Sequence, residues 1–193
     1  MRRPQISPLI SPGLPIDRRV AGHVSSFVKT SIVFGLLVVA SGGWSAGLAK
    51  DLSPGETFEE LKKLCGEWKG TTAEGGAEKV SYRLIAADTV LLEAWVLSSG
   101  REALTVYHRD GDDLIATHYC PRGNQPRLKL TSASTEKGFF FEFISATNLP
   151  EAEATHQHRF EIQIHGPDFF TRSETYISKG KLDAGVTSYS RTR

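Results

Sequence analysis

Hydrophobic and polar residues alternate with a period of two over most of the chain from about residue 66 onward. Residues 79–84 read Lys-Val-Ser-Tyr-Arg-Leu, and residues 127–131 read Arg-Leu-Lys-Leu-Thr. Successive side chains of a β-strand point to opposite faces of the sheet, so this alternation predicts strands with one buried and one solvated face.

Turn-forming residues recur about every ten positions, as at Gly75-Gly76, Asp110-Gly111 and Lys179-Gly180. They predict strands near residues 66–72, 78–86, 90–98, 102–110, 114–119, 127–134, 138–145, 155–165, 169–178 and 184–192. Short hairpin connections favour an up-and-down meander, and closing the meander into a barrel removes its exposed edges. A β-sandwich is the competing architecture, but its crossovers need longer connections.

The residues before the first strand have helical spacing instead. Phe58, Leu61 and Leu64 are separated by charged residues, and Gly66 ends the pattern. The expected fold class is therefore all-β: a closed antiparallel up-and-down barrel of about ten strands with a short N-terminal helix.

The first 49 residues differ in character from the rest and have the features of a secretion signal. An apolar run over residues 32–40 follows basic residues and leads to Gly47-Leu48-Ala49, a small-x-small cleavage site. We expect residues 1–49 to be removed and residues 50–193 to form a secreted or periplasmic barrel domain. The run is shorter than the about 20 residues of a stable membrane span. An uncleaved N-terminal anchor is the alternative.

Composition narrows the possible partners. The chain has 193 residues, a formal net charge of +1 and no basic run beyond the signal segment, which argues against nucleic-acid binding. In an oxidising compartment Cys65 and Cys120 either form a disulfide or remain separate thiols. Patterning leaves the oligomeric state open.

Two segments resemble a known family. Residues 61–70 read LKKLCGEWKG, and Gly66 and Trp68 match the Gly-x-Trp that opens the first strand of lipocalin-like (calycin) proteins. Residues 105–127 read TVYHRDGDDLIATHYCPRGNQPR and resemble uncharacterised bacterial lipocalin-like proteins with a Thr-His-Tyr-Cys…Gly-Asn-Gln-Pro-Arg pattern. The resemblance spans about residues 55–193 and implies a barrel closed at one end by the Trp; it assigns no activity. The chain is more distantly similar to nitrobindin, a haem-binding barrel, and to fatty-acid-binding proteins.

Strand parity predicts that four histidines face inward: His108, His118, His156 and His158. Buried imidazoles need partners, so these residues either orient a ligand, hold haem or another metal, or bond to backbone or water near strand ends. His156 and His158 would lie about 7 Å apart on one strand face, which suits a metal site if another strand supplies a third ligand.

Residues 117–127 form the densest polar cluster, with His118, Tyr119, Asn124, Gln125 and Arg127. Polar groups at a barrel mouth orient ligands, and Arg127 suits a carboxylate or phosphate. The alternative is a shaped turn, since Gly123-Asn124 suits a backbone with positive φ.

Glu93 shares parity with Leu91 and Trp95 and is expected inside, where it would orient a ligand, act as a base, or pair with Arg172. Cys120 lies close to His118, but no third orienting residue is evident, and no other catalytic motif is present. Catalysis is therefore disfavoured.

The leading function is reversible binding of a small, partly apolar ligand inside the barrel. Two alternatives remain. One is haem or metal binding through His118, His156 or His158, and the other is a structural or partner-binding envelope protein whose barrel is filled by its own side chains.

Overall fold

The computed structural model describes residues 50–132 and 134–192. The predicted signal segment, residues 1–49, lies outside the described residues, so its removal stays a prediction. One helix precedes ten strands: α1 (Pro54–Lys62), β1 (Gly66–Thr72), β2 (Ala77–Ile85), β3 (Val90–Val96), β4 (Glu102–Asp110), β5 (Asp113–Tyr119), β6 (Gln125–Leu130), β7 (Phe139–Thr147), β8 (His156–Gly166), β9 (Phe169–Ser178) and β10 (Lys181–Arg191).

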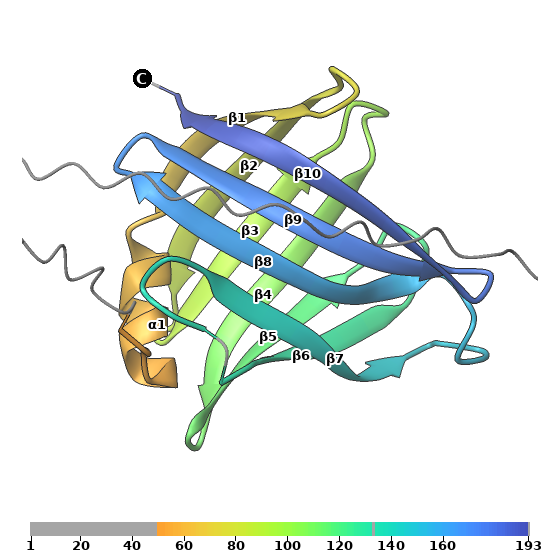
Figure 1. Cartoon of the computed structure of the whole chain (residues 1–193), viewed down its shortest axis with the longest axis horizontal. Coiled ribbons are helices and arrows are strands. Elements are labelled where there is room, and N and C mark those ends of the chain that lie inside the picture. Colours follow the sequence, from red (N-terminus) through yellow and green to blue (C-terminus); the bar gives the residue numbers. More distant parts are fainter. Residues whose placement is uncertain (1–49, 133, 193) are drawn as a thin grey trace, which may run out of the picture. The chain divides into compact units, whose positions relative to one another are not determined.

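The strands form a closed antiparallel barrel, as the sequence predicts (Figure 1). Each strand pairs with its neighbour along the chain, and β1 pairs with β10 to close the ring. The bounds of β1, β4 and β9 coincide with the predicted ranges. β6 ends earlier than expected, at Leu130, because the residues after it form a loop held by a bridge between Thr135 and Gly138.

Helix α1 lies across one end of the barrel, which we call the helix end (Figure 1). Ser53 and Glu56 form a capping box: the Ser53 hydroxyl accepts from the Glu56 N–H at 3.2 Å, and the Glu56 carboxylate accepts from the Ser53 N–H at 2.9 Å. Phe58 and Leu61 are the buried apolar side chains of α1. In the part of the chain that the structure describes, no helix has the length and apolar character needed to cross a membrane.

Trp68 closes the helix end. Its Nε1 donates to the Leu64 carbonyl at 2.7 Å, and the Arg191 guanidinium lies 4.1 Å from the centre of its ring. Arg191 also donates to the carbonyl oxygens of Cys65 at 2.8 Å and Pro167 at 2.8 Å. One side chain near the end of β10 therefore binds the connection between α1 and β1 and the turn between β8 and β9.

Aromatic rings fill the interior next to this closure. Trp68 packs edge-on against Phe170 with ring centroids 4.8 Å apart, and Phe170 stacks on Tyr189 at 4.6 Å. The Tyr189 ring can lie against β1 because position 70 is glycine: a Cβ there would come within 2.5 Å of the ring. The helix end is thus packed with the protein's own side chains.

The two cysteines lie at opposite ends of the barrel. Cys65 follows α1 at the helix end, and Cys120 follows β5 at the other end, which we call the open end. Both thiols are free, so the separate-thiol alternative describes this structure.

Replacing Arg191 by Ala should lower the free energy of unfolding by about 2 kcal/mol. The change removes the hydrogen bonds to the carbonyl oxygens of Cys65 and Pro167 and the contact with the Trp68 ring. Urea denaturation measures this loss. The control is Arg83→Ala on β2, an exposed side chain whose removal should change stability by less than about 0.5 kcal/mol. Equal effects of the two substitutions would contradict the role given to Arg191.

Candidate functional site

A fully buried ion pair crosses the barrel interior. Glu93 on β3 and Arg172 on β9 are 0% and 1% exposed, and Arg172 Nη1 lies 3.0 Å and 3.2 Å from the two carboxylate oxygens of Glu93. The ion pair considered from the sequence for Glu93 is therefore present. A charge buried without its partner is costly, so each of these residues depends on the other.

Two tyrosines complete the surroundings of Glu93. Tyr82 donates to Glu93 Oε1, and Tyr107 donates to Oε2 at 2.7 Å. Burial, with the nearby Glu93 carboxylate adding to it, raises the pKa of both phenols well above the usual value, so they remain protonated donors. Arg172 Nη1 also lies 3.0 Å from the Tyr107 hydroxyl.

The interactions continue toward the open end. Arg172 Nε donates to Glu174 Oε1 at 2.8 Å, and Gln157 Nε2 donates to the same oxygen at 2.8 Å. We call this set the polar network: Tyr82, Glu93, Tyr107, Gln157, Arg172 and Glu174. Sequence reasoning identified Glu93 and Arg172 and missed the others. Parity with Arg172 would have placed Glu174 inside, whereas no regular pattern places Gln157 there.

Nine buried polar atoms have no hydrogen-bond partner within the described residues, and five of them are Thr57 Oγ1, Asn124 Oδ1, Thr131 Oγ1, His156 Nε2 and His158 Nδ1. The other four are Trp95 Nε1, His118 Nε2, Gln157 Oε1 and Arg172 Nη2. We call them the unpaired polar atoms. They belong to neighbouring groups, because Gln157 and Arg172 share Glu174 Oε1 and the Arg172 guanidinium lies 5.0 Å from the Trp95 ring centre. Nearly all buried polar atoms in folded proteins are hydrogen-bonded, so such a group calls for a partner from outside the chain.

His118 faces inward as predicted and is 4% exposed. Its Nδ1 lies 3.1 Å from Thr105 Oγ1, and the register places Glu93, Thr105 and His118 side by side on β3, β4 and β5. Burial lowers the pKa of His118 to about 4, so its imidazole is neutral near pH 7 and its unpaired Nε2 can donate or accept.

Two cavities lie at the open end, with volumes of about 230 and 280 Å³. Tyr176 and Asp183 line both cavities, and Glu174 lines the second. Because Glu174 also binds Arg172 and Gln157, the second cavity borders the polar network directly. The second cavity thus reaches Glu174, the hydrogen-bond partner of Arg172 and Gln157, while the residues that carry the unpaired polar atoms line neither cavity.

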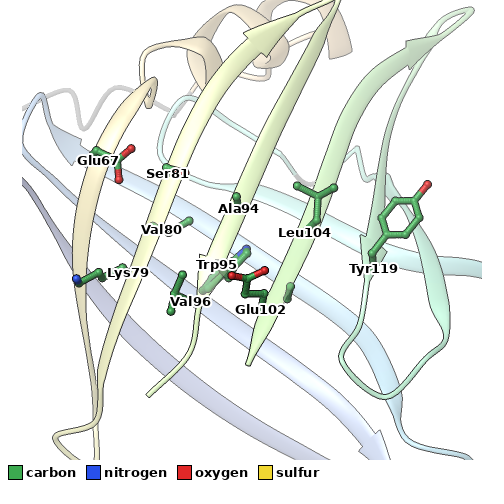
Figure 2. Close-up of a pocket in the computed structure, with 11 residues that line it drawn as sticks. Glu67, Lys79, Val80, Ser81, Ala94, Trp95, Val96, Glu102, Leu104 and Tyr119 are labelled. Atoms are coloured by element: carbon green, nitrogen blue, oxygen red, sulfur yellow. The ribbon is translucent and has the colours of Figure 1, made fainter. Parts of the chain in front are cut away.

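A larger groove of about 550 Å³ lies on the outer face of β2, β3 and β4 (Figure 2). Its lining side chains include Ser81, Leu104 and Tyr119, each of which alternates along its strand with a buried inward residue. Tyr119 is 48% exposed, so this ligand candidate from the sequence belongs to the outer surface.

His108 also lies on the outer face, contrary to the parity prediction. Tyr107 is 0% exposed and Thr105 is buried, which defines the inward face of β4, and His108 lines a surface cavity beside α1. The prediction was wrong because the outer face of β4 carries the apolar residues Leu104 and Val106, which made it resemble the core face.

The predicted regular alternation of His156 and His158 is interrupted. The β8–β9 register shifts between Gln157 and Arg159, and the Gln157 side chain reaches Glu174. The rings of His156 and His158 pack around Phe143, with centroids 4.6 and 6.0 Å from it. Among the described residues, no three His, Cys, Asp or Glu side chains are grouped as metal ligands.

The remaining candidates shape the turn between β5 and β6. Asn124 Nδ2 donates to the Thr155 carbonyl at 2.8 Å, and Gln125 Oε1 accepts from Thr147 at 2.6 Å. Arg127 is partly exposed and lies 3.7 Å from Asp110. These contacts favour the shaped-turn alternative for this cluster, in which His118 Nε2 and Asn124 Oδ1 are buried without a partner among the described residues.

Comparisons with known proteins support the fold and assign no activity. No family model matches the chain, and no curated protein matches it. Among solved structures, the chain is similar to a protein of unknown function of the DUF3598 family from Nostoc punctiforme, with a TM-score of 0.51 and 13% sequence identity. The match covers 76% of this chain and 53% of that one, so this chain spans about half the length of that protein. At this identity the likeness shows the fold alone.

Glu93→Gln should lower the free energy of unfolding by about 3 kcal/mol, because it leaves the buried Arg172 charge without the fully buried one of its two carboxylate partners. The control is Glu102→Gln on β4, which makes the same chemical change at an exposed position. Urea denaturation compares the two. A loss below about 1 kcal/mol for Glu93→Gln would show that the pair is not the main support of the interior.

His118 should make the protein less stable in acid. Its pKa in the folded protein is about 4, below the ordinary 6.5, so between these pH values the unfolded chain binds a proton that the folded chain does not. Stability present above pH 6.5 is therefore lost as the pH falls toward 4.

Over this window the unmodified protein should lose on the order of 3 kcal/mol more than His118→Gln. Denaturant titrations at several pH values measure the difference. His165→Gln, at an exposed imidazole, is the control and should keep the original slope. An unchanged slope in His118→Gln would contradict the buried neutral state.

Proposed function

We propose that the protein binds a small, partly apolar ligand in the barrel interior, with entry from the open end. The observation that carries this proposal is the group of unpaired polar atoms on Trp95, His118, Gln157 and Arg172. Leaving a buried donor or acceptor unsatisfied costs about 1–3 kcal/mol each, so a fold that places several together gains stability from a molecule that satisfies them.

The walls around these atoms suit an apolar ligand body. The Arg172 guanidinium lies between aromatic groups, 4.0 Å from the Phe160 ring centre and 5.0 Å from that of Trp95. Each open-end cavity is smaller than the about 300 Å³ at which typical ligand pockets begin, which favours a small ligand.

We further propose that the chain is a lipocalin-like protein exported to the periplasm or the cell exterior. Support comes from Gly66 and Trp68 at the start of β1, from the closure of the helix end by Trp68, and from the ten-stranded barrel. The export proposal depends on the signal features of residues 1–49.

The protein produced from the full-length sequence and purified from a bacterial envelope fraction should retain an organic molecule in native mass spectrometry. Trp95→Phe removes one unpaired donor while keeping an aromatic wall, and should weaken binding about tenfold, as expected for one lost hydrogen bond. Tyr119→Phe on the outer face is the control and should bind as the unmodified protein does.

Two outcomes would overturn the proposal. A clean protein mass, with no uptake from a library of small amphiphiles, would favour the structural or partner-binding alternative. A Soret band in the absorption spectrum would identify haem and redirect the assignment to the histidines.

A further inference from the structure

The balance of charge and hydrogen-bonding groups in the interior restricts the polar end of the ligand. Arg172 carries one positive charge and touches two carboxylates, Glu93 and Glu174, so the three groups together carry one net negative charge. In a buried environment this surplus repels a second anion strongly, because little water screens it. The arginine is therefore already neutralised and is a poor receptor for a carboxylate ligand.

One of the two open-end cavities has the same sign, whereas the other is lined by Arg101 and Arg122 as well as Asp183. The second open-end cavity is lined by the carboxylates of Glu74, Glu78, Glu174 and Asp183, and its lining contains no Lys or Arg. Burial is the main cause that raises the pKa of Glu78, and the nearby Glu174 carboxylate adds to it. This cavity, which borders the polar network through Glu174, therefore disfavours an anionic ligand.

The unpaired polar atoms also disfavour a cationic head group. Arg172 Nη2 and Trp95 Nε1 are donors and need an acceptor, which an ammonium group does not offer. Gln157 Oε1 is an acceptor and needs a donor, which a carboxylate does not offer. The neutral imidazole of His118 can serve in either role.

Resting on the proposed function, we infer that the barrel selects ligands whose buried end is an uncharged group with both an acceptor oxygen and a donor hydrogen, as in a primary amide. The acceptor oxygen would take hydrogen bonds from Arg172 and Trp95, and the donor would bond to Gln157. Carboxylates and ammonium groups with the same apolar tail would each fail half of this pattern.

The test compares octanamide, octanoate and octylammonium, three probes with a common tail, by isothermal titration calorimetry on the purified full-length chain. Octanamide should bind at least tenfold more tightly than either charged probe. Tighter or equal binding of octanoate or octylammonium would overturn the inference while leaving ligand binding itself intact. Failure of all three probes would also overturn it, and the retained mass in native mass spectrometry then shows separately whether the proposed function stands.

A charge variant makes the test sharper. Glu174→Gln removes the surplus negative charge while keeping an oxygen acceptor for Arg172 and Gln157, so it should shift the octanoate-to-octanamide affinity ratio about tenfold toward octanoate. Glu102→Gln, the same change on the exposed surface, should leave the ratio unaltered. An unchanged ratio in a folded Glu174→Gln protein would contradict the charge argument.

Discussion

The interior of this barrel depends on the buried contact between Glu93 and Arg172. The two residues lie on β3 and β9, which are separated around the ring by β10, β1 and β2 on one side and by β4 to β8 on the other. A charge in such a place is tolerated only when its partner and its hydrogen bonds are in position, so Tyr82, Tyr107 and Glu174 are constrained in turn. Those constraints leave Arg172 Nη2 without a partner in the described chain.

The two ends of the barrel interior differ on either side of the contact between Glu93 and Arg172. Toward α1, the space is filled by Trp68, Phe170 and Tyr189. The Arg191 guanidinium packs against the indole ring of Trp68. Toward the open end, polar groups lie among the aromatic ones, and Tyr176 lines both cavities, with Glu174 lining the second. A ligand proposal therefore concerns the open half, where the protein's own side chains do not satisfy every buried polar atom.

The strands were predictable because most of them keep one apolar and one polar face, and the turns between them carry residues suited to tight reversals. The same parity correctly placed Glu93 and His118 inside. It failed at His108, since both faces of β4 carry apolar residues, and it failed around Gln157, since a shift in register there breaks the alternation. Tyr119 and Arg127 are polar residues near a barrel end, a position that does not by itself distinguish the inside from the outer surface.

The sequence by itself determined the periodicity, the turns and the N-terminal helix, because each of these depends on residues close together in the chain. Only the tertiary structure decided which inward residues meet. Glu93 and Arg172 are 79 positions apart and come into contact because barrel closure and strand register bring β3 and β9 toward the same interior point. Periodicity states which face a side chain occupies, whereas the register around a closed ring states what it touches, and that is why the unpaired polar atoms could be found only in the folded molecule.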